Sequence, residues 1–82
     1  MKIEFMNKGS RFKKKKTIIS GFRDELVEYL SLLLNLVTQD LKECIKELKR
    51  YLCTYVSMKE VNGVVVLEIN GDFRNKLPQS LP

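Results

Sequence analysis

The 82-residue sequence predicts a single α+β domain: a two-layer sandwich with element order β-β-α(α)-β-β-α and its helices on one face of a small mixed sheet. Three observations support this fold class. Extended segments flank turn residues near the N-terminus, and apolar residues recur at spacings of three and four over residues 41–55. An Asn-Gly pair at 62–63 separates two further β-rich segments.

The first two strands are expected to form a β-hairpin. Polar and apolar residues alternate over 2–5, as in a half-buried strand, and 7–10 is rich in turn residues. Extended character resumes over 12–20 with a β-branched run at 17–19. Ser20 and Gly21 are then expected to stop the second strand.

Residues 26–37 are predicted to form an apolar helix within a helical insertion over 23–39. The polar positions Glu28, Ser31 and Asn35 form one narrow stripe, so the wide apolar face needs burial on most sides. We therefore expect its outer side to meet a partner protein, a second copy of the chain or rRNA-bound neighbours. The candidate protein-interaction residues are Leu26, Leu30, Leu33, Leu34 and Val37.

A break at 38–40 is expected to precede a second helix, although one uninterrupted helix over 24–55 is the alternative. Asp40 and Glu43 fit a capping box at its start. Cys44 and Cys53 are nine positions apart, about 2.5 helical turns, so they should point in nearly opposite directions. We interpret both as packing residues in a reducing compartment, without a disulfide or a shared metal.

The C-terminal part predicts a second hairpin. Residues 55–60 and 64–70 have strand character on either side of the Asn62-Gly63 turn, and the run at 64–67 suggests burial on both faces. Gly71 and Asp72 end the last strand. Residues 73–77 are expected to form about one helical turn before a tail at 78–82.

Positive charge is concentrated at one end of the chain. Residues 1–23 hold eight basic residues and one acidic residue, a net charge of +7, whereas 24–82 hold seven basic and nine acidic residues, a net charge of −2. Six of the nine residues in the basic segment, defined here as 8–16, are lysine or arginine. Positive charge concentrated in this way attracts polyanions. The simpler alternative is a solvated hairpin that only keeps the protein soluble.

The composition disfavours catalysis and membrane insertion. The chain has no histidine, no Cys/His metal spacing and no Gly-rich phosphate loop, so we expect no enzyme activity, cofactor or metal site. Asp24 and Glu25 are more simply acids in the first turn of a helix. No apolar run is long enough to span a membrane, and no signal peptide is evident.

Among polyanions, the pattern favours folded RNA over DNA. The lysines of the second helix are interleaved with Glu43 and Glu47, so no helix is expected to carry a basic face suited to the major groove. A basic hairpin suits shape and backbone contacts with RNA. Phe12 either stacks on a base or anchors the loop. The candidate RNA-binding residues are Lys8, Arg11, Phe12, Lys13, Lys14, Lys15, Lys16 and Arg74.

Three blocks of the sequence resemble the translation initiation factor 1 family, which has the suppressor-of-initiation-codon fold. Residues 15–22 (KKTIISGF) resemble the family's second strand and the Gly-apolar pair after it. Residues 40–53 resemble its main helix, and 62–74 resemble its last hairpin strand with the Gly-Asp-x-Arg turn at Gly71, Asp72 and Arg74. The blocks occur in the family's order.

The resemblance implies binding to the small ribosomal subunit near the initiator tRNA, where the family's basic loop lies against ribosomal RNA and tRNA and assists start-codon selection. In this sequence the loop corresponds to residues 8–16. Partners would be the ribosome and, through the apolar helix, ribosomal or initiation-factor proteins. The chain would then be ribosome-associated in the cytoplasm or the mitochondrion.

Two departures from the family keep other functions open. Residues 23–39 are longer and more apolar than the family's usual connection, and the sequence ends at Pro82 without the family's further helix and strand. The same fold occurs in a protein of the mitochondrial large ribosomal subunit and in reinitiation and tRNA-delivery factors. A structural ribosomal protein is therefore the first alternative, and a module that docks on proteins through the apolar helix is the second.

Overall fold

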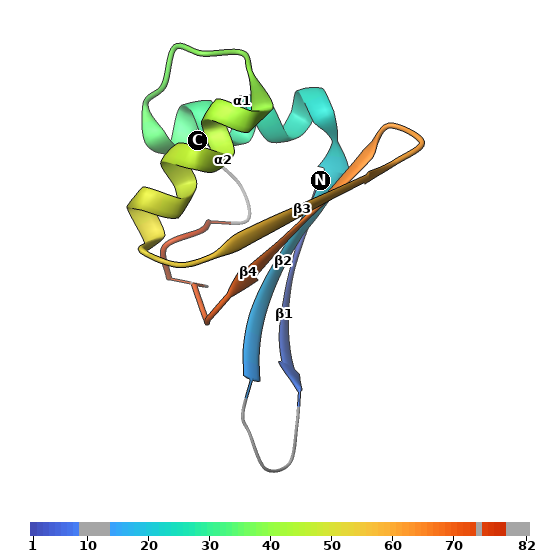
Figure 1. Ribbon diagram of the computed structural model, residues 1–82, viewed down its shortest axis with the longest axis vertical. Helices are drawn as coiled ribbons and strands as arrows, with labels where there is room; N and C mark the ends of the chain where they lie inside the picture. Colours follow the sequence, from blue (N-terminus) through green and yellow to red (C-terminus); the bar gives the residue numbers. More distant parts are fainter. Residues whose placement is uncertain (9–13, 74, 79–82) are drawn as a thin grey trace.

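The computed structural model describes residues 1–8, 14–73 and 75–78 and confirms the α+β class with two layers. The elements follow in the order β1 (Lys2–Lys8), β2 (Lys14–Phe22), α1 (Arg23–Leu34), α2 (Leu41–Leu52), β3 (Val56–Val61) and β4 (Val64–Asn70). The four strands form one sheet in the order β1-β2-β4-β3. All pairs are antiparallel, so the prediction of a mixed sheet is wrong. Both helices lie on one side of it (Figure 1).

The core fills the space between the two helices and the covered face of the sheet. Its members are apolar residues from α1, α2, β2, β3 and β4, because alternate strand residues and one side of each helix point inward. Leu77, which follows β4, is also part of the core, and the largest fully buried side chains among the described residues are Ile19, Leu26, Leu30, Leu41, Leu48, Leu67, Ile69 and Leu77.

Strand β2 ends later than the sequence predicts, because it continues through Ser20 and Gly21 to Phe22. Gly21 pairs with Val65 and lies against the start of the chain, where a Cβ would be 3.0 Å from the Met1 Cα. The glycine therefore permits the close approach of β1 to β2 at this end of the sheet and does not terminate the strand.

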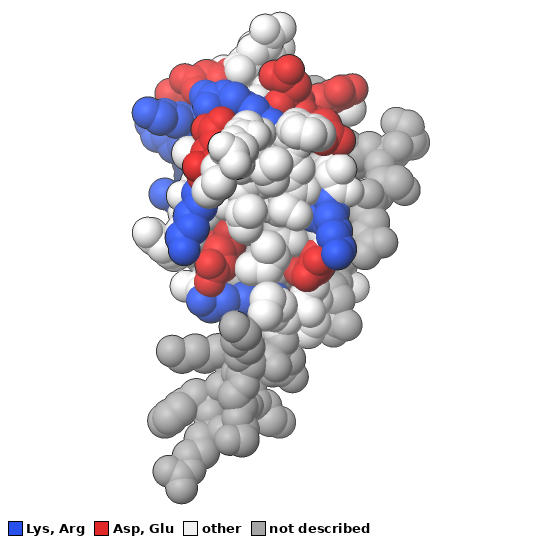
Figure 2. Space-filling model, turned by 90° about the vertical axis from the view of Figure 1, so that its right-hand side faces the viewer, with Lys and Arg blue, Asp and Glu red and all other residues white. Residues whose placement is uncertain are grey.

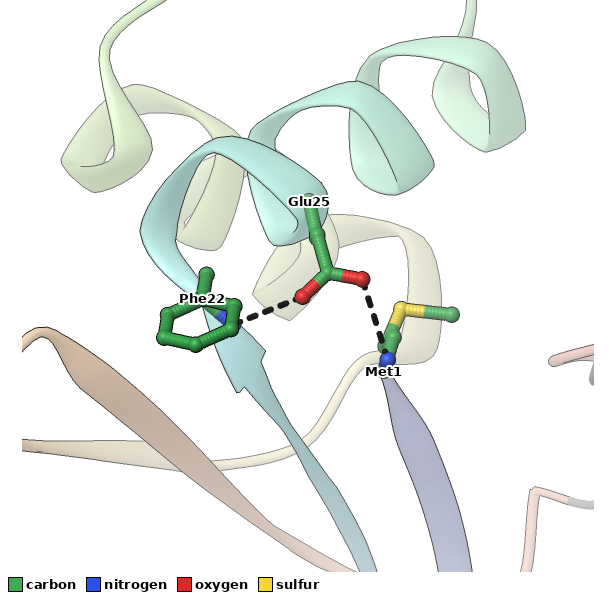
Figure 3. Close-up of polar contacts among 3 residues, drawn as sticks. All are labelled: Met1, Phe22 and Glu25. Atoms are coloured by element: carbon green, nitrogen blue, oxygen red, sulfur yellow. Dashed lines mark hydrogen bonds and ion pairs between the residues drawn. The ribbon is translucent and has the colours of Figure 1, made fainter.

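Helix α1 begins at Arg23, directly after β2, and ends at Leu34, three residues before the predicted end. Glu25 stabilises its start: the Phe22 amide donates to the Glu25 Oε1 at 3.1 Å, and the Met1 amino group lies 3.1 Å from Oε2 (Figure 3). The backbone bond from Phe22 and then the bond from the amino group lower the pKa of Glu25. Asn35, in the left-handed conformation with φ 56°, ends the helix.

The predicted break before α2 is confirmed, and α2 begins after Asp40, whose Oδ1 accepts from the Lys42 amide at 3.0 Å. The helix ends at Leu52 because Cys53 adopts a left-handed conformation with φ 53°. Cys44 is buried as predicted, but Cys53 is exposed and is not a packing residue. Neither cysteine is in a disulfide.

The second hairpin matches its prediction closely. Asn62 and Gly63 have φ values of 52° and 82°, which is the geometry of the tight turn favoured between twisted strands. Strand β4 is central but is not buried on both faces: Val65, Leu67 and Ile69 are buried, whereas Val64 is exposed. The prediction failed there because both helices cover the same face of the sheet. Figure 2 shows the other face, whose uncharged centre is flanked by basic and acidic side chains.

A single hydrogen-bonded turn stands where the sequence predicted the last helix. The amides of Lys76 and Leu77 both donate to the Phe73 carbonyl, at 3.0 and 2.9 Å. Leu77 is buried in the core, and the Tyr29 hydroxyl donates to the Pro78 carbonyl at 2.6 Å. Burial raises the pKa of Tyr29 to about 12. The start of the predicted tail is therefore held against α1.

Candidate nucleic-acid interface

The β1–β2 hairpin extends beyond the two-layer body (Figure 1). Strand β4 pairs with β2 from Phe22 as far as Lys16, which lies opposite Asn70. Beyond that point only β1 and β2 continue together among the described residues, with Asn7 opposite Lys15 and Lys8 opposite Lys14. The hairpin is therefore two-stranded where it carries its basic residues, and neither helix covers it.

The basic charge at this end has few acidic neighbours. Lys16 forms an ion pair with Glu68 of β4, at the border between the body and the hairpin. Lys15 is exposed, and no ion pair joins it to a carboxylate of the residues that the structure describes. The predicted RNA-binding residues Arg11, Phe12, Lys13 and Arg74 lie outside the described residues.

The Gly-Asp-x-Arg turn lies at the base of the hairpin, which the sequence alone does not indicate. The Gly71 amide donates to the Lys15 carbonyl at 2.8 Å. The buried Thr17 hydroxyl donates to the Gly71 carbonyl at 2.9 Å and accepts from the Phe73 amide at 3.3 Å. The turn therefore fixes the position at which β2 leaves the body. Thr17 holds this turn against β2, a role that its strand propensity alone does not indicate.

Glycine at position 71 meets two requirements. Its φ is +120°, a conformation that other residues rarely adopt, and a Cβ there would be 2.7 Å from the Phe73 Cε2. This agrees with the expectation that the last strand ends at Gly71, since β4 stops at Asn70. Asp72, the next residue of the turn, is exposed.

The candidate protein-interaction residues of the apolar helix do not share one exposed surface. Leu26 and Leu30 are fully buried in the core, and Leu33 and Leu34 are half-buried against it. Val37 is fully exposed. A partner that docks on this part of the chain stays a prediction, but Leu26 and Leu30 are core residues in this fold.

The structure corrects the expectation that no helix carries a basic face. Lys42, Lys46 and Lys49 occur four and three positions apart, so they lie on one side of α2, with Glu43 beside Lys46 at a spacing of three. All three are exposed and line a groove of about 400 Å³ between α2 and β3. The spacing of the three lysines is the sequence signal for a basic side of this helix, because residues three and four positions apart are neighbours on a helix surface.

Two other classes of site were sought among the described residues. No group of three His, Cys, Asp or Glu side chains there could hold a metal ion. None of the helices in the described part of the chain is long and apolar enough to cross a membrane.

Comparison with protein-family models, with curated proteins and with solved structures finds no match for this chain.

Proposed function

We propose that this protein is an RNA-binding translation factor that resembles initiation factor 1. In this proposal the basic segment, 8–16, contacts ribosomal RNA and initiator tRNA, and the protein itself performs no chemistry. The protein would assist start-codon selection on the ribosome, in the cytoplasm or the mitochondrion. The observation that supports it best is the concentration of basic residues in the sequence at 8–16, together with a β1–β2 hairpin that extends beyond the body.

Two features of this hairpin suit contact with an RNA backbone. Alternate residues of a strand point to opposite faces, so Lys15 and Lys16 of β2 can serve phosphates on both sides of the hairpin. The turn at Gly71 fixes the base of the hairpin through Lys15 and Thr17, which orients its basic end relative to the body. Contacts of this kind recognise the shape and backbone of RNA more than its sequence.

The salt dependence of RNA binding tests the proposal. Four to six phosphate contacts give a slope of about −3 to −5 for log K against log salt. Replacing the four lysines at 13–16 with serine should remove most of this slope. The melting temperature should change little, because exposed charges contribute little to stability.

A matched variant distinguishes the contribution of the hairpin to RNA affinity from the contribution of the net charge of the protein. The quadruple replacement of Lys42, Lys46, Lys49 and Lys59 by serine removes the same four charges from the body and should retain most of the affinity. Equal loss from both variants, or unaltered binding to ribosomal particles after the hairpin replacement, would reject the basic segment as the RNA-binding surface. Co-purification of the tagged protein with ribosomal particles, followed by a high-salt wash, would distinguish a dissociable factor from a permanent ribosomal protein.

A further inference from the structure

The groove between α2 and β3 combines three features that together suit a peptide ligand. Its rim is basic, with Lys42, Lys46 and Lys49 exposed along α2. Its floor is apolar and includes the buried side chains of Ile45 and Val56. Its other side is a strand at the edge of the sheet.

Strand β3 has an available backbone edge. The sheet order places β3 at one end, paired with β4, and no other strand of the described residues pairs with its outer side. Figure 1 shows β3 at the near edge of the sheet, below α2. The N–H and C=O groups on an unpaired edge can form a ladder with an added strand.

The rim lysines are not neutralised within the fold. No ion pair joins Lys42, Lys46 or Lys49 to a carboxylate of the described residues. Lys49 lies over the Tyr55 ring, with its Nζ 5.5 Å from the ring centroid, and Tyr55 is itself exposed in the groove. The groove therefore presents positive charge that an acidic ligand can match.

The spacing of the lysines fits an extended peptide. The helical rise places Lys42 and Lys46 about 6 Å apart along α2, and Lys46 and Lys49 about 4.5 Å apart. Side chains on one face of a strand repeat about every 6.8 Å. The interval from Lys42 to Lys46 is close to this repeat, so acidic residues at alternate positions of an added strand would meet these two lysines, with Lys49 adding charge at the end of the groove.

We infer that the α2–β3 groove binds an acidic, extended segment of a partner protein, which adds to the sheet as a strand beside β3. The apolar floor and the open backbone edge favour a peptide over RNA, because RNA would leave the ladder groups of β3 unused. This inference does not rest on the proposed RNA-binding function.

The probe for this inference is a fluorescein-labelled peptide of alternating valine and glutamate. It should bind the full chain with an affinity that falls as salt rises. The double variant Lys46→Glu with Lys49→Glu should raise its Kd about tenfold or more, since like charges then face the peptide. The control variant Lys2→Glu with Lys76→Glu, two exposed lysines outside the groove, makes the same change in net charge and should leave the Kd within about twofold.

Hydrogen exchange tests the backbone ladder separately from charge. On peptide binding, amides of β3 should exchange more slowly, whereas those of β1 at the opposite edge should not. A peptide with alternate N-methylated amides keeps its charge but cannot complete the ladder, so it should bind more weakly. Thermal melting of each variant checks that it is folded.

Three results would overturn the inference. The first is equal binding of a peptide with lysine in place of glutamate. The second is peptide binding with unchanged exchange in β3. The third is an absence of peptide binding combined with weakened binding of an RNA oligonucleotide in the Lys46→Glu, Lys49→Glu variant, which would make the groove an RNA surface.

Discussion

The two ends of β2 have different physical roles within one strand. At the covered end, Ile19 is fully buried beneath the helices and the strand is paired on both sides by β1 and β4. At the projecting end, Lys15 is exposed, and β4 no longer pairs beyond Lys16. The difference shows how a small domain can place charge away from its core, where that charge does not oppose folding.

The first prediction separates the two ends most strongly. Ile19→Asp should destabilise the protein by about 4 kcal/mol or more, which is enough to unfold a small domain, because it places an unpaired carboxylate in the core. Lys15→Asp, on the same face of the same strand, should change stability by about 0.5 kcal/mol or less. Chemical denaturation of both variants measures the difference. A folded, cooperatively melting Ile19→Asp variant would contradict the assignment of the covered end.

The second prediction concerns Gly71, at the junction between the two ends. Gly71→Ala should cost about 1–3 kcal/mol, because it combines a positive φ with a Cβ 2.7 Å from the Phe73 ring. Gly63→Ala is the matched control, since Gly63 also has a positive φ (+82°) but no atom near its added Cβ. Its cost should be smaller, about 1 kcal/mol. Equal costs for the two variants would show that the contact with Phe73 does not constrain the junction.

The third and smallest effect depends on pH and belongs to the covered end. The pKa of Glu25 is below its ordinary value of 4.5 in the folded protein, first because of the Phe22 amide and then because of the Met1 amino group. The stabilisation is therefore complete above the unfolded-state pKa and is lost as the pH falls through the lowered folded-state pKa.

Glu25→Gln should accordingly lower the melting temperature slightly at neutral pH, and the difference from the parent protein should shrink as the pH drops below about 4. Glu28→Gln, an exposed acid on the same helix, is the control and should show less pH dependence. If the difference in melting temperature between Glu25→Gln and the parent protein stayed constant across this pH range, the hydrogen bonds of the Glu25 carboxylate would not be its cause.

Local signals explain which elements were predicted well. The Asn62-Gly63 pair fixes a turn because both residues tolerate a positive φ, and the bounds of β4 follow from that turn and from Gly71. Asp40 marks the start of α2 because its side chain accepts a backbone hydrogen bond of the first turn. Each of these features is decided by residues close together in the sequence.

Other features depended on segments that are distant in the sequence. Gly21 has turn chemistry, but in the fold it is a strand residue because pairing with Val65 and the proximity of Met1 make use of its missing side chain. The apolar run at 64–67 could not reveal that one face of β4 would stay uncovered. Nor could the charge pattern of α2 show that its lysines would border an open strand edge.

The sequence by itself determined the number and type of the main elements, the turn between β3 and β4, and the concentration of basic residues at 8–16. These follow from backbone conformational preferences and side-chain periodicity, which act over a few residues. The tertiary structure decided the strand order, the face that the helices cover, the position of Gly71 beneath Lys15, and the pairing of a basic helix side with the edge of β3. Those outcomes depend on contacts between residues up to about fifty positions apart, whose geometry no local pattern specifies.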